Sequence, residues 1–225
     1  MQPPVPQPGN GGARIVELAR GEGIQPPAGQ VREVYSLRYG LVGLRRKIPG
    51  GRAVLVRLLY PGEVFCVSGI GGDGSVAQAI TRSGAALIHG RGEAIDESLV
   101  DILQREVELT EQRIVELTSL TSREILARRL LEFSWLQWRH GDGRPGPFRI
   151  PVTRRELAGL MGIRPESLAR LLSWLVARGL IAVAGRQARI VDRPGLLGVA
   201  GISEEDDNLA CQKLTGIMES MVTQM

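Results

Sequence analysis

Cysteine and histidine are scarce in this chain of 225 residues. The two cysteines, Cys66 and Cys211, stand far apart and outside any paired motif. Their number excludes a disulfide framework and an iron–sulfur cluster held by four thiolates of this chain. His89 is the only histidine in the first half, and a single histidine at a strand end is more often structural than a haem ligand. We therefore expect no metal and no cofactor, and no neighbouring pattern supports a redox role for Cys66.

Long apolar runs and catalytic motifs are also missing. No stretch approaches the ~18 apolar residues that cross a bilayer. Residues 1–13 are rich in proline, lack the basic and apolar regions of a signal peptide, and are typical of a disordered lead. The chain has no Ser-His-Asp set, metal-ligand cluster, P-loop or dinucleotide fingerprint. We expect a cytoplasmic protein that is not an enzyme and does not contact membranes.

Charge is distributed unevenly along the chain. Residues 1–120 are neutral overall, whereas residues 121–200 combine 14 arginines with 6 acidic residues, which gives a net charge of +8. Residues 201–225 carry a net charge of −4. Because phosphate contacts dominate affinity for nucleic acids, a basic segment the size of a domain fits a polyanionic partner. The alternative is a solvated arginine-rich surface in a chain that uses few lysines.

Short apolar runs separated by glycine and proline fill residues 14–92. Regular short strands with turn signals between them predict an antiparallel barrel or sandwich. The glycine-rich segment 69–74 could cradle an anion with its backbone amides, although a wide hairpin loop is the more common structure for it. The expected strands are Val31–Leu37, Leu41–Ile48, Ala53–Tyr60, Val64–Val67, Val76–Thr81 and Ala85–His89.

A helical pattern replaces the strand pattern after Gly92. Over residues 93–121, apolar side chains recur at alternating spacings of three and four, while Glu, Gln and Arg fill most other positions. A stripe this narrow can be buried against a copy of the same helix, so we predict a homodimer. The alternative is that the stripe packs on the strands of its own chain. Its members are Val100, Leu103, Val107, Thr110, Ile114 and Leu117.

Residues 122–200 form the next expected domain, which begins with a helix over Ser122–Arg139. A loop rich in glycine and proline follows at 140–147. After residue 200, we expect an acidic linker that contains the run 204–207, and then an amphipathic helix over about 207–223.

Two helix signals stand close together after residue 150. Thr153 can cap a helix, and Glu156 three residues later closes a capping box. Gly162 permits the left-handed backbone of a tight turn, and Pro165 suits the first turn of a second helix. With a small residue and apolar positions at the matching offsets, these signals are typical of a helix-turn-helix.

The second of these helices, expected over about 164–178, buries a face of leucines and leaves Glu166, Ser167 and Arg170 exposed near its N-terminal end. Two short strands, Leu180–Ala184 and Ala188–Val191, then predict a hairpin wing. Together with the net charge of +8, this favours a winged helix-turn-helix that binds DNA. A helical domain that docks on a protein is the alternative.

This order of domains resembles the cyclic-AMP receptor protein / fumarate–nitrate reduction regulator (CRP/FNR) superfamily over roughly residues 15–195. The strongest motif runs from Val152-Thr-Arg-Arg-Glu-Leu-Ala through Gly162-Ile-Arg-Pro-Glu-Ser-Leu-Ala-Arg170. Weaker support comes from Tyr35–Arg46 and Leu59–Glu63. The resemblance implies an α+β fold. It would comprise an N-terminal antiparallel β-barrel of the jelly-roll, cyclic-nucleotide-binding type, a long dimerisation helix and a C-terminal winged helix-turn-helix.

The resemblance also assigns DNA-reading residues. Glu166 matches a glutamate whose carboxylate accepts from a cytosine amino group, and Arg170 matches an arginine that donates to guanine O6 and N7. Pro165 and Ala169 stand where relatives often carry further polar readers, which puts the site preference in doubt. The candidate contacts to the DNA backbone are Thr153, Arg155, Arg164, Ser167, Arg186 and Arg189.

The implied sensor domain departs from the cyclic-nucleotide pattern. Relatives that bind cyclic nucleotides hold the ribose and phosphate with a Gly-Glu pair and a following Arg-Ser. Gly62-Glu63 matches the pair, but residues 71–77 contain no Arg-Ser. Because a buried phosphate would then lack a counter-charge, we expect no dependence on cyclic AMP, and the effector stays unknown.

The expected partners are a second copy of the chain, an inverted repeat in double-stranded DNA and RNA polymerase. The resemblance suggests that polymerase contacts the loop 139–148. Activation and repression both remain open. The other open alternative is a small-molecule sensor whose winged domain docks on a protein partner.

Overall fold

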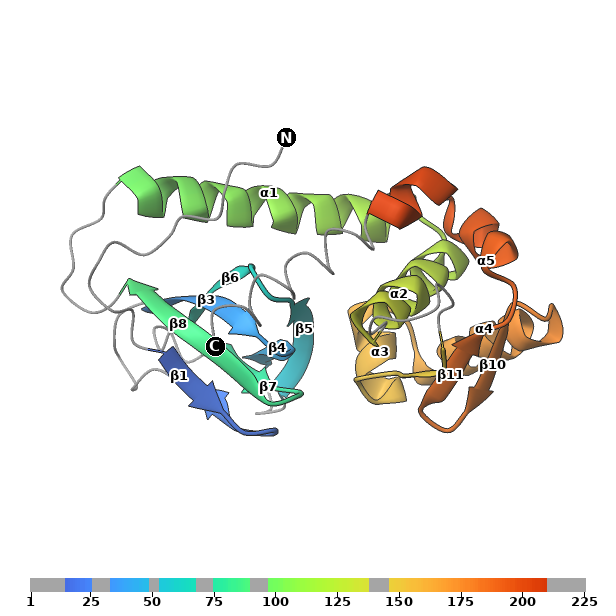
Figure 1. Ribbon diagram of the computed structural model, residues 1–225, viewed down its shortest axis with the longest axis horizontal. Coiled ribbons are helices and arrows are strands. Elements are labelled where there is room, and N and C mark those ends of the chain that lie inside the picture. The colour runs from blue at the N-terminus through green and yellow to red at the C-terminus, as the bar shows by residue number, and fades with distance from the viewer. Residues whose placement is uncertain are drawn as a thin grey trace. The chain divides into compact units, whose positions relative to one another are not determined.

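A computed structural model describes residues 15–25, 33–48, 53–67, 75–89, 97–137 and 146–209 (Figure 1). These residues divide into two compact units between Gln112 and Arg113, and each unit is described by itself. Four predicted features lie outside the described residues. They are the proline-rich lead 1–13, the loop 69–74, most of the loop 139–148 and positions 210–223 of the C-terminal helix.

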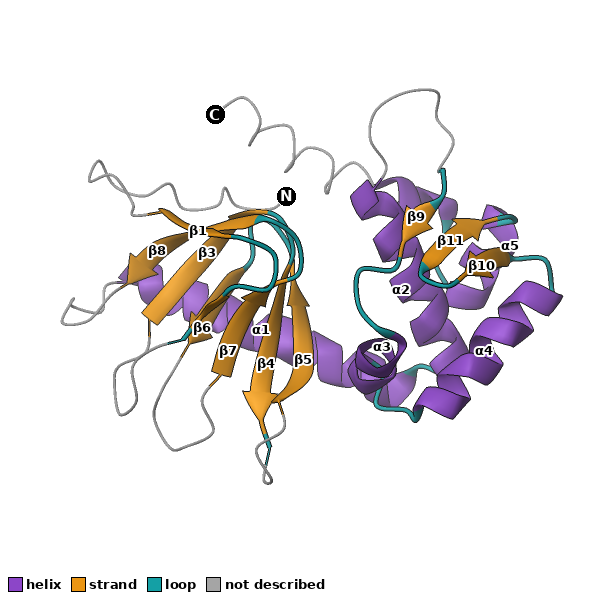
Figure 2. Ribbon diagram, turned by 90° about the horizontal axis from the view of Figure 1, so that it is seen from below, coloured by secondary structure: helices purple, strands orange, loops and turns teal. Residues whose placement is uncertain are grey.

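The first unit contains two four-stranded antiparallel sheets, drawn in orange in Figure 2. One sheet has the order β1-β8-β3-β6 and the other β2-β7-β4-β5. This is the two-sheet arrangement of a jelly roll and not a closed barrel. The strands are β1 (Ile15–Leu18), β2 (Gly23–Ile24), β3 (Glu33–Tyr39), β4 (Val42–Lys47), β5 (Ala53–Leu59), β6 (Val64–Val67), β7 (Ser75–Ala79) and β8 (Ser83–His89).

The six predicted strands are confirmed as β3 to β8, with ends that differ by a few residues. The short strands β1 and β2 were not predicted. β1 pairs with β8 through Ile15 to Leu18, and β2 pairs with β7 through only two residues. Such short segments carry little periodicity of their own, so their pairing partners decide their structure.

Alternating side chains from both sheets form the core of the first unit. Leu37, Val42, Leu59 and Val67 are fully buried there. The ring of Tyr35 also lies in this core, stacked on Phe65 with 5.5 Å between centroids. The short apolar runs of the sequence therefore supply the side chains of the inner faces of two packed sheets.

Helix α1 (Glu97–Ser119) follows the sheets and carries the predicted apolar stripe. The five apolar members of the stripe are exposed by 39 to 57% in the single chain. Thr110 is exposed as well, and its hydroxyl donates to the carbonyl of Glu106 at 2.8 Å. Within the first unit, Val100, Leu103 and Val107 are thus not buried by the strands of their own chain, contrary to the alternative considered from the sequence.

The described residues of the second unit include helices α2 to α5 and a small sheet with the order β10-β11-β9. The predicted helices and the wing are confirmed, whereas β9 and α5 were not predicted. Within the described residues, no helix is both long and apolar enough to span a bilayer. The elements are α2 (Ser122–Gln137), β9 (Phe148–Arg149), α3 (Arg154–Leu160), α4 (Pro165–Ala177), β10 (Ile181–Ala184), β11 (Gln187–Ile190) and α5 (Arg193–Ala200).

The acidic run after α5 is more than a linker, because one of its members is a buried structural partner. Residues 204–209 are helical, and Asp207 is only 4% exposed. Its carboxylate accepts two hydrogen bonds from Arg193, at 2.7 and 2.8 Å, and one from the indole nitrogen of Trp135 at 3.0 Å. Asp207 therefore fastens the segment after α5 to α2 and to α5 itself.

Candidate nucleic-acid interface

Helix α3 begins with the predicted capping box. The Thr153 hydroxyl accepts from the backbone N–H of Glu156 at 3.2 Å and donates to the Glu156 carboxylate at 2.8 Å. The same carboxylate accepts from the backbone N–H of Thr153 at 2.8 Å. These bonds satisfy amides at the helix start that have no partner inside the helix, so the sequence fixes where α3 begins.

The turn between α3 and α4 depends on Gly162 and Pro165. Gly162 has a φ of +66°, a left-handed conformation that side chains other than glycine adopt at a cost. The N–H of Ile163 then donates to the carbonyl of Ala158 at 3.0 Å, which closes the end of α3. Pro165 occupies the first turn of α4, where its missing N–H removes no helical hydrogen bond. The turn therefore sets the second helix directly against the first.

Helix α4 is amphipathic and presents the predicted base-reading residues to solvent. Leu168, Leu172 and Leu175 are buried on its inner face. Glu166 and Arg170 are exposed one helical turn apart. Among the described residues, neither side chain forms an ion pair, and the two do not pair with each other. Their carboxylate and guanidinium groups are therefore available to hydrogen-bond with the edges of neighbouring bases.

The predicted backbone contacts differ in how accessible they are. Arg155, Arg164 and Arg189 are exposed, and within the described chain none of them is held by an ion pair or hydrogen bond. Ser167 is half-buried on α4. Thr153 is exposed while its hydroxyl caps α3. Three arginines, on α3, at the N-cap of α4 and on β11, are thus free to contact phosphates.

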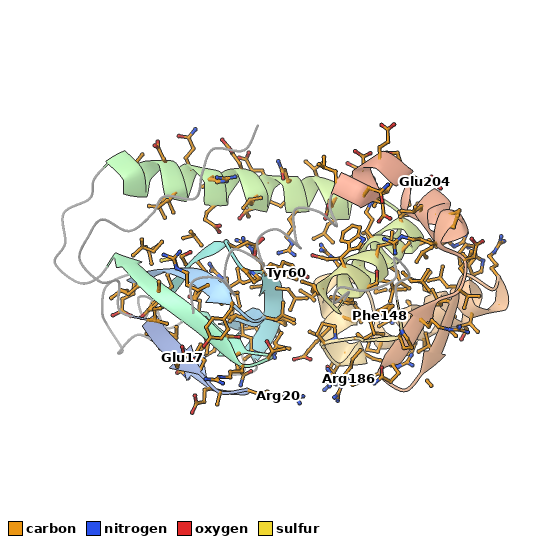
Figure 3. The ribbon with its side chains drawn as sticks, in the orientation of Figure 1. Glu17, Arg20, Tyr60, Phe148, Arg186 and Glu204 are labelled. Carbon is orange, nitrogen blue, oxygen red and sulfur yellow. The ribbon has the colours of Figure 1, made fainter. Side chains whose placement is uncertain are left out.

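Arg186 has a structural task at the tip of the wing, where Figure 3 labels it. Its Nε donates to the carbonyl of Ile150 at 3.1 Å, and its Nη2 donates to the carbonyl of Pro151. In addition, Nη2 of Arg154, in the first turn of α3, donates to the carbonyl of Gly185 at 3.3 Å. The wing is therefore tied to the start of α3. A phosphate contact by Arg186 stays a prediction that has to compete with these bonds.

Sequence reasoning missed a cluster that extends the exposed ridge of α4. Trp174 follows Arg170 by four residues, and Arg178 follows Trp174 by four. The guanidinium carbon of Arg178 lies 4.3 Å from the Trp174 ring centroid, and that of Arg123 on α2 lies 4.5 Å from it. The spacing of four was visible in the sequence, but the contribution of Arg123 depends on how α2 packs against α4.

In the first unit, the turn at Gly62-Glu63 resembles part of a cyclic-nucleotide-binding motif, but Glu63 is already paired with another side chain of the same unit. The Glu63 carboxylate accepts from the backbone N–H of Tyr60 at 3.0 Å and lies 3.5 Å from Nη2 of Arg57. Arg57 also pairs with Glu106 on α1. Burial disfavours the charge on Arg57, but the hydrogen bond to Glu106 and the charge of Glu63 outweigh it and raise the pKa of the guanidinium. The Glu63 carboxylate therefore already has partners within the first unit.

Comparison with known proteins identifies the second unit and relates the chain to curated proteins. Residues 124–199 match the family model of the Crp-like helix-turn-helix domain. The chain is 24% identical over 194 residues to the transcriptional activator protein FnrA of Stutzerimonas stutzeri, which covers 82% of this chain and 79% of FnrA. It is 27% identical to the nitrogen fixation regulation protein FixK of Rhizobium meliloti, over 83% of this chain and 86% of that protein.

Solved structures show the same fold. A transcriptional regulator of the CRP/FNR family from Thermus thermophilus matches with a TM-score of 0.67 at 24% identity, over 84% of this chain and 98% of that chain. A CRP-family regulator from the same organism matches with a TM-score of 0.64 at 26% identity, over 84% of this chain and 97% of that one.

Proposed function

This chain belongs to the CRP/FNR superfamily of transcription regulators, and we propose that it works as a homodimer that reads an inverted repeat in promoter DNA. Helix α4 of each protomer enters the major groove, where Glu166 and Arg170 contact bases. Dimeric helix-turn-helix proteins place their recognition helices in half-sites ~34 Å apart, so the two halves of the site lie one helical turn apart.

One observation carries this proposal: among the described residues, Glu166 and Arg170 are exposed and unpaired on helix α4, whose opposite face is buried in the second unit. An i, i+4 pair of opposite charge on a helix usually forms an ion pair that satisfies both groups. Here the two groups keep their hydrogen-bonding capacity for a ligand. The free arginines Arg155, Arg164 and Arg189 in the same unit add charge for the phosphates.

The uncovered stripe of α1 supports the homodimer. Five apolar side chains at heptad spacing are exposed on one helix, which is an unfavourable arrangement for an isolated chain in water. A second copy of α1 would bury the stripe as a two-stranded coiled coil. Thr110 would stand within this interface as its one polar member.

The engaged Glu63 supports a regulator that does not depend on cyclic AMP. Its carboxylate is neutralised by Arg57, and the segment that follows in the sequence has no Arg-Ser to hold a phosphate. The effector stays unidentified. RNA polymerase is the proposed second partner through the loop 139–148, which lies mostly outside the described residues.

Selection from a random duplex library with the purified, ligand-free protein tests the proposal, followed by a salt titration on the selected sequences. We expect an inverted repeat to be enriched, with an affinity that falls steeply as salt rises. Failure to enrich any sequence, together with weak and salt-independent binding to duplex, would favour the alternative that the winged domain docks on a protein.

Arg170→Ala separates base reading from backbone binding on the selected site. We expect it to cost about 1–3 kcal/mol on the preferred sequence and little on random duplex. Equal losses on both sequences would refute Arg170 as a base reader.

Val107→Glu tests the dimer, because it places a charge in the centre of the stripe. We expect a monomer by sedimentation and a loss of about 100-fold in affinity for the inverted repeat, since two linked half-site contacts become one. Val115→Glu is the matched control, because Val115 is 58% exposed on the same helix but lies off the stripe. If both variants remained dimers, the interface would lie elsewhere.

A further inference from the structure

The exposed ridge of α4 continues beyond its two base-reading residues. Glu166, Arg170, Trp174 and Arg178 follow one another at intervals of four, so they form one inclined i, i+4 ridge along the helix and its C-terminal cap. Arg123, in the first turn of α2, stacks on the same indole. Two elements thus place two guanidinium groups on one aromatic ring beside the proposed reading face.

The two arginines carry positive charge that the protein does not neutralise. Within the part of the chain that the structure describes, Arg123 and Arg178 contact the Trp174 ring and have no acidic partner. Two like charges held close to one ring repel each other, and an anion bound between or beside them would relieve this repulsion. The cluster therefore fits a negatively charged ligand better than it fits an isolated protein surface.

Stacking also prepares both side chains to donate hydrogen bonds. A guanidinium that lies over an aromatic ring uses its flat face, so its N–H groups stay free at the edge for the oxygens of a phosphate. Contact with the ring limits the rotamers of a long side chain, so less conformational entropy is lost when it binds. Arg123 and Arg178 are both exposed, and Trp174 is half-buried between the helix and solvent.

We propose that Arg123, Trp174 and Arg178 form a second DNA contact in each protomer, in which both arginines bind phosphates of the DNA backbone and the indole holds them in place. This inference rests on the proposed function, because it assumes that the ridge of α4 faces DNA. The cluster does not read bases. It should strengthen binding to every sequence equally and increase the dependence of binding on salt.

Arg123→Gln and Arg178→Gln test the proposal, singly and together, in salt titrations on the selected inverted repeat and on a random duplex. For each lost phosphate contact, we expect the slope of log K against log salt to become shallower by about 0.9. Affinity should fall by the same factor on both duplexes. Trp174→Phe, which keeps an aromatic face, should preserve more of the slope than Trp174→Leu.

Arg20→Gln is the matched control, because Arg20 is an exposed arginine of the first unit and the same charge is lost. It should leave the slope unchanged. If the double variant kept the wild-type slope, the proposal would be overturned. If its unfolding free energy were also lower than that of the wild type, the cluster would serve only to hold α2 against α4. That result would leave the effect of Arg170→Ala on the preferred site intact, so the two proposals fail separately.

Discussion

The two units provide contrasting examples of how an arginine side chain is used. In the first unit, Arg57 is 12% exposed and is held between Glu63 and Glu106, which joins β5 and the following turn to α1. In the second unit, Arg155, Arg164, Arg170 and Arg189 are exposed and have no charged partner among the described residues. A count of arginines therefore does not by itself indicate a DNA-binding surface, because arginines with and without charged partners are counted alike.

The second unit also contains arginines of the first kind. Arg193 is held by Asp207, and Arg129 pairs with Glu116 and Glu132. Arg128 donates to the carbonyl of Ala200 at 2.9 Å. The net charge of +8 over residues 121–200 therefore divides into a structural part and a part that is available to a ligand. Neutralising the first part should cost stability, and neutralising the second should cost DNA affinity.

The largest loss of stability should follow Asp207→Ala. The change leaves the guanidinium of Arg193 and the indole N–H of Trp135 without their shared acceptor in a buried position. Breaking a buried pair in this way costs about 3–5 kcal/mol in unfolding free energy. Denaturant unfolding measures the loss. Asp206→Ala is the control, because Asp206 is exposed and, among the described residues, bonds only with nearby Ser203. Equal losses of unfolding free energy in the two variants would contradict the structural role assigned to the Arg193–Asp207 pair.

A smaller loss should follow Arg57→Gln in the first unit. Glu63 and Glu106 would then face each other without the charge between them, but Glu63 is 27% exposed and water would compensate in part. We expect an unfolding free energy lower by about 2 kcal/mol, less than for a fully buried pair, with DNA affinity unchanged below the melting temperature. Arg82→Gln, from an exposed pair 3.9 Å from Glu17, should change stability by under ~0.5 kcal/mol. A loss of DNA affinity without a loss of stability would contradict the structural role of Arg57.

The smallest of the three effects should come from Thr153→Ala. The change removes the cap of α3 and should cost about 1 kcal/mol of unfolding free energy. Thr118→Ala on α1 is the control, because its hydroxyl bonds back to the carbonyls of Ile114 and Val115 within the same helix and caps no helix start. If DNA affinity fell further than the unfolding free energy explains, Thr153 would also contact the DNA backbone, as the sequence predicts.

Much of the fold could be predicted because its signals are local. The strands β3 to β8 correspond to short apolar runs between glycine and proline breaks. The cap of α3, the turn glycine and the first-turn proline of α4 are also present in the sequence itself. Two short elements of the second unit could not be found in this way. β9 has only two residues, and its strand structure depends on the pairing of Phe148 and Arg149 with β11. α5 has Asp192 as its N-cap, but it contains two glycines in eight residues, which is not typical of a helix.

The sequence by itself determined the order of the domains, the capped helix-turn-helix, the heptad stripe of α1 and the position of Glu166 and Arg170 on one face of a helix. Each depends on spacings of a few residues. Only the tertiary structure decided which charges remain free, because a charge is neutralised by partners that can be distant in the sequence. Glu106 stands 49 residues from Arg57, and Arg123 reaches Trp174 from another helix. Packing brings these groups together, and no local pattern records it.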